Sequence, residues 1–326
     1  MKTVGAVIMR RLAKTPFDRG LTLPLFPNLP VMEHDSPGES ANGIPVAQNA
    51  YLDRLASFGP DSLNTGSGLS HIGLFCGGGG LDLGLGFAGF RTVVANDIAP
   101  SFVASVTSNI PGSIGLVRDV LSLTKEELQA ASGGETIDLV SAGPPCQAFS
   151  ILGMRGALDA PRGKLALKYF ELVSELRPRA FVFENVPGKA HGEKGGGLAT
   201  PSSWALGGVE GLPNHRKRPH GPRVKGRYAR ILPGERDATD HTDRIHPALP
   251  SGTVLVGSAA GGGRPHIHPF EDRVITVREG ARLQSFPDWY VFRGTNTAQY
   301  RQVGNAVPPL LAYEVGKRIA AALEGS

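Results

Sequence analysis

The chain has 326 residues, of which 40% are hydrophobic, and its net charge at neutral pH is +5. This length and composition suffice for one large domain, or for a domain with a smaller lobe. Only two cysteines are present, Cys76 and Cys146, which excludes a disulfide framework, and no apolar run approaches membrane-spanning length. The apolar run near the N-terminus is cut at Arg10, too early for a secretory signal, so we expect a soluble protein of the cytoplasm.

The first 69 residues contain prolines and scattered polar residues but no sustained hydrophobic period. This composition predicts an N-terminal extension that is disordered or loosely packed over residues 1–69. No feature of the extension points to a function.

A strand, turn, helix, strand pattern begins at His71. The segment HIGLF predicts a short buried strand, the glycines after it predict a sharp turn into a helix, and RTVVAND predicts a second strand that ends at Asp97. The pattern then recurs, with IDLVSA as a strand, residues 165–178 as a helix that Pro178 stops, and AFVFENV as the next strand. Such alternation is typical of an α/β fold with a doubly wound, mostly parallel sheet.

The alternation stops after residue 190, where glycine, proline, histidine and arginine become frequent. We therefore expect a catalytic part at 70–190, a small irregular lobe at 191–270, and C-terminal motifs at 271–326 that return to the catalytic part. Within the lobe, seven lysines and arginines lie between Asn214 and Arg230 without an intervening acid. This basic stretch fits a surface that binds a polyanion, or alternatively a solvated loop.

The glycine-rich turn GLFCGGGGLDLG lets the backbone approach a ligand closely. Asp97 ends the following strand, where a carboxylate can accept both hydroxyls of a ribose, and Asp119 lies where an adenine amino group could be met. The alternative is a tight structural turn with acids at the surface. In parallel sheets, ligands bind beyond the carboxyl ends of the strands, which favours the ligand site.

Cys146 follows Pro144 and Pro145 in the segment SAGPPCQAFS. Most free cysteines are small buried hydrophobic residues, but two prolines fix the backbone here and remove two donors, which favours an exposed loop at the ligand edge of the sheet. A thiolate is a strong nucleophile for an electron-poor ring. Glu184, at the end of the next strand, could supply a proton to that ring.

Five ordered strings, GLFCGGGG, AGPPCQAFS, FENVPG, RVITVREGARLQSFPD and QVGNAVPP, resemble the motif series of the DNA cytosine-5 methyltransferases. The resemblance covers about residues 70–190 and 270–326. It implies a sheet of the S-adenosylmethionine-dependent methyltransferase type, a lobe that recognises the target, and methyl transfer from S-adenosylmethionine to C5 of a flipped cytosine in double-stranded DNA. It also implies a restriction-modification system with a cognate restriction endonuclease, a monomeric protein and no metal.

Carried onto this sequence, the resemblance makes Cys146 the nucleophile that adds to C6, Glu184 the acid at N3, and Asn185 a residue that orients the catalytic loop. The cofactor-binding residues that it implies are Phe75, Cys76, Gly77, Gly78, Gly79, Asp97, Ile98, Asp119, Val120, Pro144, Leu165, Asn305 and Ala306. The DNA-binding residues that we expect are Gln147, Ser150, Arg216, Lys217 and Arg218.

One part of the family pattern is missing. Between the Glu184 motif and the basic stretch the family usually has a further strand and a Gln-x-Arg-x-Arg segment, and the glycine-rich sequence found here contains neither. Two functions therefore stay open: an active DNA methyltransferase with a compact recognition lobe, and a catalytically impaired remnant that still binds cofactor and DNA. Methylation of a free pyrimidine nucleotide is disfavoured, because it leaves the basic lobe without a role.

Overall fold

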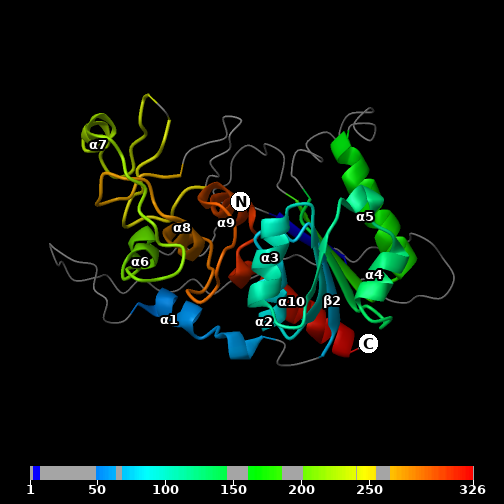
Figure 1. Cartoon of the computed structure of the whole chain (residues 1–326). Helices are drawn as coiled ribbons and strands as arrows, with labels where there is room; N and C mark the ends of the chain where they lie inside the picture. The colour runs from blue at the N-terminus through cyan, green and yellow to red at the C-terminus, as the bar shows by residue number, and fades with distance from the viewer. Residues whose placement is uncertain are drawn as a thin grey trace. The chain divides into compact units, whose positions relative to one another are not determined.

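The computed structural model describes residues 3–7, 49–63, 68–144, 161–185, 201–239, 241–254 and 265–325, with residues 3–7, 161, 162 and 185 described by their backbone alone. The chain folds into two compact units, each of which draws on separate stretches of the sequence. The first unit contains Met1–Leu25, Pro60–Lys194 and Ala306–Ser326, and the second contains Phe26–Gly59 and Gly195–Asn305. Figure 1 shows the elements of both units along the chain.

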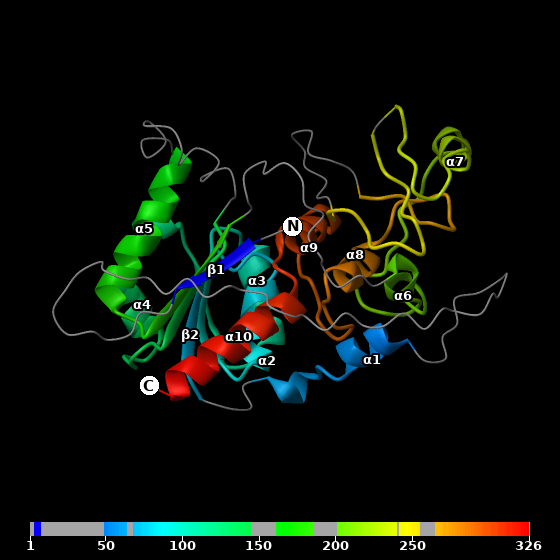
Figure 2. The ribbon, with the colours of Figure 1, turned by 180° about the vertical axis from the view of Figure 1, so that it is seen from behind.

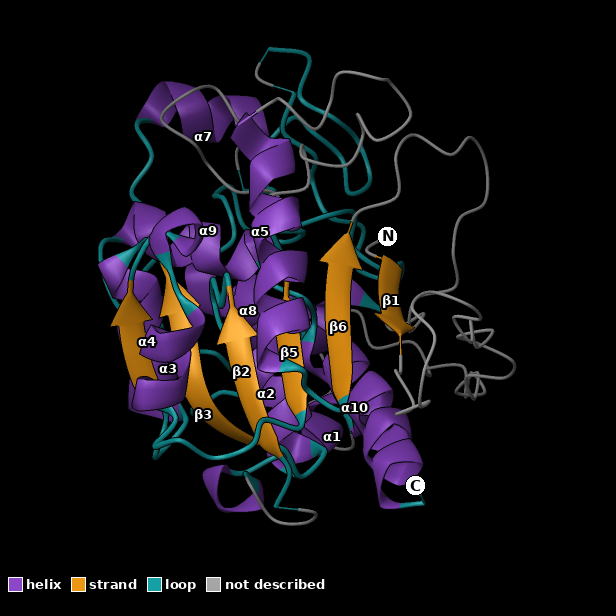
Figure 3. Ribbon diagram, turned by 90° about the vertical axis from the view of Figure 1, so that its right-hand side faces the viewer, coloured by secondary structure: helices purple, strands orange, loops and turns teal. Residues whose placement is uncertain are grey.

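The first unit is built on a six-stranded sheet with the order β1-β6-β5-β2-β3-β4. The parallel strands are β2 (Ser70–Leu74), β3 (Arg91–Asp97), β4 (Ile114–Val117), β5 (Leu139–Ala142) and β6 (Ala180–Asn185). Strand β1 (Thr3–Val7) pairs antiparallel with β6 at one edge, as Figure 3 shows. The prediction of a mostly parallel sheet is confirmed.

Helices cover both faces of this sheet, which makes it doubly wound. On one face, α2 (Gly80–Phe87) and α10 (Pro309–Glu324) lie side by side and pack through leucines and alanines on β5 and β6 (Figure 1 and Figure 2). On the other face, α4 (Lys125–Ala131) and α5 (Pro161–Leu176) cover β2, β3 and β5. The other helical segments among the described residues of the unit are η1 (Pro60–Ser62), α3 (Pro100–Asn109) and η2 (Val120–Ser122).

A buried histidine links the three central strands. Nδ1 of His71 on β2 lies 3.0 Å from Oγ1 of Thr92 on β3, and Nε2 lies 2.8 Å from Oγ of Ser141 on β5. Complete burial lowers the pKa of His71 to about 3, because an imidazolium loses its hydration there. The ring is therefore neutral at physiological pH, and both of its nitrogens are paired across the sheet.

Two segments of the range expected to be an extension are in regular secondary structure. Strand β1 pairs with the outer edge of β6 and so supplies partners for its backbone groups, with Thr3 opposite Asn185 and Val7 opposite Phe181. Helix α1 (Ala50–Ala56) begins at Asn49, whose side chain accepts a hydrogen bond from the backbone of Leu52 over 3.1 Å. Both segments are too short to give a clear period in the sequence.

The second unit contains α1, α6 (Ser202–Leu206), α7 (Pro222–Tyr228), α8 (Val277–Leu283) and α9 (Asn296–Asn305). Between these short helices the described chain is irregular, and the fully buried Arg278 holds it together by donating to the carbonyls of Pro213, Pro287 and Tyr290. The chain returns to the first unit at Ala306, later than the residue 271 that the sequence suggests, because α8 and α9 pack within the second unit. Among the described residues, no helix has the length and apolar character needed to cross a membrane.

Candidate functional site

The candidate site lies at the carboxyl ends of the parallel strands in the first unit. Leu74 on β2 pairs with Asn96 on β3 and with Ala142 on β5, and Ala142 pairs with Phe183 on β6. Because these strands run the same way, the residues that follow each pair emerge at one edge of the sheet. The register therefore brings together Phe75, Asp97, Gly143 and Glu184, which come from four separate segments of the sequence.

A strained turn carries the chain from β2 into α2. Phe75, Gly77 and Gly79 all have positive φ, of 53°, 53° and 75°, and Phe75 is one of the few residues other than glycine in this region of the backbone map. The turn is fixed by a hydrogen bond from the Cys76 N–H to the Asn96 carbonyl over 2.9 Å. A second bond runs from the Gly79 N–H to the Cys76 carbonyl over 2.7 Å. Gly79 is the N-cap of α2, so the turn ends at a helix N-terminus.

Asp97 ties this turn to the end of β3. Its Oδ2 accepts a hydrogen bond from the Gly77 N–H over 3.0 Å, and its Oδ1 accepts one from the Ala99 N–H over 2.9 Å. Burial raises the pKa of the Asp97 carboxyl, while these backbone donors oppose the rise. A carboxylate has about four acceptor positions, so two bonds leave capacity for the hydroxyls of a ligand.

Asp119 and Ile98 flank Asp97 on the side of β4. The backbone N–H of Arg118 donates to the Asp97 carbonyl over 3.2 Å, and the Asn96 side chain donates to the carbonyls of Leu116 and Arg118. The exposed Asp119 side chain caps η2 by accepting from the Leu121 N–H, while Val120 beside it is buried. Ile98 is 68% exposed, an apolar side chain next to an acid that could face a planar ring.

Glu184 ends β6 and lies beside Gly143, which follows β5. The Glu184 side chain is 6% exposed, and a Cβ on Gly143 would lie 3.3 Å from its Oε2. The glycine therefore leaves the space that the carboxylate takes. Gly143 directly precedes the buried Pro144, and this arrangement puts an acid next to the start of the Pro-Pro-Cys segment.

Several predicted residues cannot be placed in this geometry. Cys146, Gln147 and Ser150 lie outside the described residues, and so does the side chain of Asn185. The remaining predicted cofactor residues are described: Cys76 and Gly78 are buried in the glycine turn, and Leu165 on α5 packs against the core beneath β2 and β5. Asn305 is the last residue of the second unit, and Ala306 is the first residue of the chain that returns to the first unit.

The predicted DNA-binding residues Arg216, Lys217 and Arg218 are exposed in the second unit. Lys217 is ion-paired, because its Nζ lies 3.0 Å from Oε2 of Glu271 and 3.9 Å from Oε1 of Glu210. The three side chains are thus not equivalent: one of them is engaged by an acid 54 residues further along the chain.

Sequence reasoning missed Asp82, which lies fully buried on α2 beneath the glycine turn. Burial, assisted by the negative charge of Asp97, raises the pKa of Asp82 to about 7. The carboxyl occupies the place of a side chain on Gly73 of β2, where a Cβ would lie 1.8 Å from its Oδ1. The signal in the sequence is one acid among the apolar residues of GLDLGLGF, but its burial depends on a glycine in another element.

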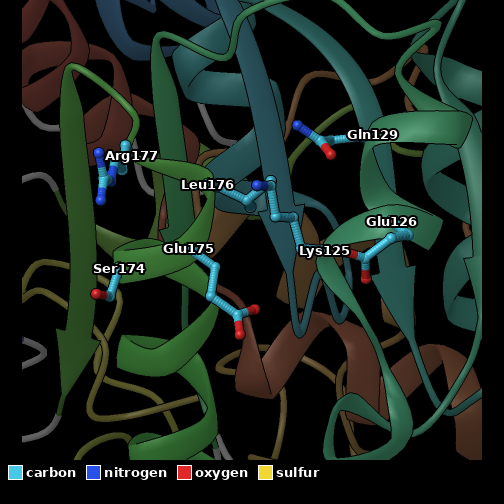
Figure 4. A pocket seen from close by; sticks show the side chains of 7 residues that line it. All are labelled: Lys125, Glu126, Gln129, Ser174, Glu175, Leu176 and Arg177. Carbon is cyan, nitrogen blue, oxygen red and sulfur yellow. The ribbon is translucent and has the colours of Figure 1, made fainter.

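A hollow elsewhere in the first unit is separate from this site. It lies between α4 and the last turn of α5 and is lined by Lys125, Glu126, Gln129, Ser174, Glu175, Leu176 and Arg177 (Figure 4). The last turn of α5 precedes β6, so the hollow lies near the amino end of that strand. Its lining mixes both signs of charge and does not single out a ligand.

Comparison with known proteins shows the family of the chain. The family described as C-5 cytosine-specific DNA methylase matches residues 69–200 and 217–321. The Type II methyltransferase M.XorII of Xanthomonas oryzae pv. oryzae is 32% identical over 360 aligned positions, which cover 77% of this chain and 84% of that protein. The Type II methyltransferase M.AquIA of Picosynechococcus is 43% identical, over 39% of this chain and 52% of that protein.

Solved structures show the same fold. A prophage-encoded DNA modification methyltransferase from E. coli superposes with a TM-score of 0.65 at 25% identity, covering 78% of this chain and 99% of that one. The Dnmt2 methyltransferase of S. pombe superposes with a TM-score of 0.51 at 18% identity, and the match covers 78% of this chain and 99% of that one. The second likeness concerns the fold alone.

Proposed function

Because the chain belongs to the family of C-5 cytosine-specific DNA methylases, we propose that it transfers a methyl group from S-adenosylmethionine to C5 of cytosine in double-stranded DNA. The observation that carries the proposal is the meeting of Glu184 with Gly143, the residue that leads into Pro144, Pro145 and Cys146. The proposal assigns the acid to the end of β6 and the nucleophile to the segment that follows β5.

The residues of the glycine turn fit the cofactor. The carboxylate of Asp97 keeps acceptor capacity for ribose hydroxyls, the turn brings backbone close to the ligand at the start of α2, and exposed Ile98 offers an apolar contact for the adenine. Asp119 would accept from the adenine amino group, and Asn305 would close the pocket. S-adenosylmethionine supplies an electrophilic methyl group when it is bound.

The residues on the base side would act on the cytosine ring. The thiolate of Cys146 adds to C6, and Glu184 delivers a proton to N3, so that the electrons of the ring collect at C5. Once C5 carries the methyl group, loss of the C5 proton returns the electron pair to the ring and expels the thiolate, and N3 returns its proton to Glu184. Gln147 and Ser150 follow Cys146 and would contact the DNA, and Asn185 would hold the loop in place.

The proposal extends to the surroundings of the enzyme. Its relatives are named Type II methyltransferases, so we expect a cognate restriction endonuclease in the same system. We also expect a monomer that acts in the cytoplasm, where its DNA is. The alternative is that the protein is a remnant that binds cofactor and DNA without turnover. This alternative stays open because the Gln-x-Arg-x-Arg segment is missing from the sequence.

Covalent trapping tests the proposal. The protein is incubated with S-adenosylmethionine and a mixed-sequence duplex that contains 5-fluorocytosine, whose fluorine cannot leave as a proton, and we expect a denaturant-resistant adduct. Cys146→Ser should abolish the adduct, and Glu184→Gln should slow its formation, because an amide donates a hydrogen bond but delivers no proton.

Two controls separate the alternatives. Labelled methyl transfer to genomic DNA without an adduct would contradict the covalent mechanism. Cofactor and DNA binding without either methyl transfer or adduct would identify the remnant.

A further inference from the structure

A rigid reverse turn in the second unit holds one phenylalanine in solvent. Ile267 and Val274 form an antiparallel bridge at its base, and the His268 N–H donates to the Arg273 carbonyl over 2.8 Å. At the tip, Nδ1 of His268 accepts hydrogen bonds from the backbone N–H groups of Phe270 and Glu271, over 3.2 and 3.1 Å. Both the base and the tip of the turn are therefore fixed by hydrogen bonds.

The two acids at the tip are neutralised by basic side chains. Glu271 accepts from Nε and Nη2 of Arg273 over 2.8 and 2.9 Å, and from Lys217 over 3.0 Å. Asp272 accepts from Nη2 of the buried Arg244 over 2.6 Å. The hydrogen bonds from Arg273 lower the pKa of Glu271 to about 2, so this acid stays ionised and paired. Neither acid is left to repel a polyanion on its own.

The Phe270 side chain takes no part in these bonds. It is 58% exposed, and in the ring contacts described its ring forms only a T-shaped pair with the His268 ring, at a centroid distance of 6.0 Å. A single exposed apolar residue is ordinary on a protein surface. This one differs because the polar groups beside it are bonded to the body of the unit, so that the ring alone projects from a fixed turn.

A basic segment reaches the tip of this turn through one ion pair. Lys217 reaches Glu271 at the tip, and Arg216 and Arg218 are its neighbours in the chain. Within the described part of the chain, no salt bridge joins either arginine to an acid. The tip thus presents one aromatic ring, and the basic segment tied to the tip by the Lys217–Glu271 ion pair carries two exposed arginines.

We propose that Phe270 contacts the bases of double-stranded DNA, by stacking on them or wedging between them, while Arg216 and Arg218 bind the flanking phosphates. The inference rests on the proposed function and names the residues by which the second unit holds its substrate. Apolar wedges and aromatic rings that stack on bases act together with basic residues on the backbone in DNA-binding proteins. Charge complementarity selects DNA as the partner, because the exposed Arg216 and Arg218 lie on either side, in the chain, of the lysine that pairs with Glu271.

The test compares Phe270→Ala with the arginine variants in the full chain. Binding to a random-sequence duplex is measured over a range of salt concentrations. We expect Phe270→Ala to lower the affinity about ten-fold without changing the slope against salt, because no phosphate contact is lost. The double variant Arg216→Ala, Arg218→Ala should lower the affinity and flatten the slope. Leu249→Ala, which removes another exposed apolar side chain of the unit (56%), is the matched control and should change neither.

A second measurement reads the contact directly. In Phe270→Trp the indole should be quenched on adding DNA, beyond any change in Trp204 and Trp289 of the native chain, because stacking on a base quenches its fluorescence. Equal affinities of Phe270→Ala and Leu249→Ala for the duplex, or no added quenching, would overturn the inference. Phe270 would then be assigned to a contact with another protein. Methyl transfer is assayed separately: DNA binding that needs Phe270 in a protein without turnover would sink the proposed function and keep this inference.

Discussion

Oδ2 of Asp97 accepts a hydrogen bond from the backbone N–H of Gly77 over 3.0 Å, and this bond joins the end of β3 to the turn after β2. The same carboxylate accepts from Ala99 through its other oxygen. Asp97 therefore orders the glycine turn in addition to any ligand that it holds.

We expect Asp97→Ala to lower the affinity for S-adenosylmethionine by at least about ten-fold, since a charged acceptor contributes about 1.5–3 kcal/mol per hydrogen bond. Titration calorimetry measures the effect. Asp119→Ala is the comparison, and its effect should be smaller, because that side chain is exposed and caps only η2. Absence of cofactor binding in the native chain would refute both the active enzyme and the remnant.

Gly84 allows α2 and α10 to touch. A Cβ at this position would lie 2.3 Å from the Pro309 carbonyl oxygen and 2.4 Å from Cβ of Ala312, so Gly84→Ala must push the helices apart. We expect the free energy of unfolding, measured by urea denaturation, to fall by about 1–3 kcal/mol, because overpacking destabilises a core. Gly226→Ala in α7 is the control, because no atom lies within 4 Å of its added Cβ. That change should be neutral, or stabilising by up to about 1 kcal/mol.

The sequence predicted β2, β3, β5 and β6 because most of their residues are buried and the turns beside them are marked by glycine or proline, whereas β4 is short and largely exposed. Asp97 and Glu184 were predictable for the same reason, since their position depends only on where a strand ends. Strand β1 was not, because its five residues become a strand by pairing with β6, almost 180 residues later in the chain.

The environment of individual side chains was harder to predict than their place in the fold. Lys217 was expected to meet DNA with its two neighbours, yet it pairs with Glu271, a contact between distant residues that no local pattern reveals. Asp82 lies on an apolar helix, and its burial follows from the space left by Gly73 on the adjacent strand. Such contacts are set by packing between elements, which composition and periodicity do not encode.

Asp82 should make the stability of the protein depend on pH. Its pKa is raised from 3.8 to about 7 by burial and by Asp97, so the folded state keeps a proton that the unfolded state loses. The contribution of the neutral carboxyl to stability is complete below about pH 4 and is lost as the pH rises to about 7. Asp82→Asn removes this dependence, because an amide does not titrate.

The measurement is the free energy of unfolding of the native chain and of Asp82→Asn between pH 4 and pH 8. From pH 4 to pH 8, the free energy of unfolding of Asp82→Asn should rise relative to that of the native chain by up to about 4 kcal/mol. The exposed Asp61→Asn is the matched control and should run parallel to the native chain. Parallel curves for Asp82→Asn as well would show that Asp82 is ionised in the folded protein.

Gly143 should be needed for turnover rather than for binding the cofactor. Its missing side chain leaves room for Glu184, and an added Cβ would lie 3.3 Å from Oε2, so the carboxylate must shift by a few tenths of an ångström in Gly143→Ala. Small displacements of a catalytic group are costly, and we expect kcat for methyl transfer to DNA to fall about ten-fold while the affinity for S-adenosylmethionine stays unchanged. Gly59→Ala has no atom within 4 Å of the added Cβ and serves as the control, with native kcat expected. A loss of cofactor affinity in Gly143→Ala, with kcat preserved at saturation, would place Glu184 on the cofactor side of the site and remove it from the role of acid at the cytosine ring.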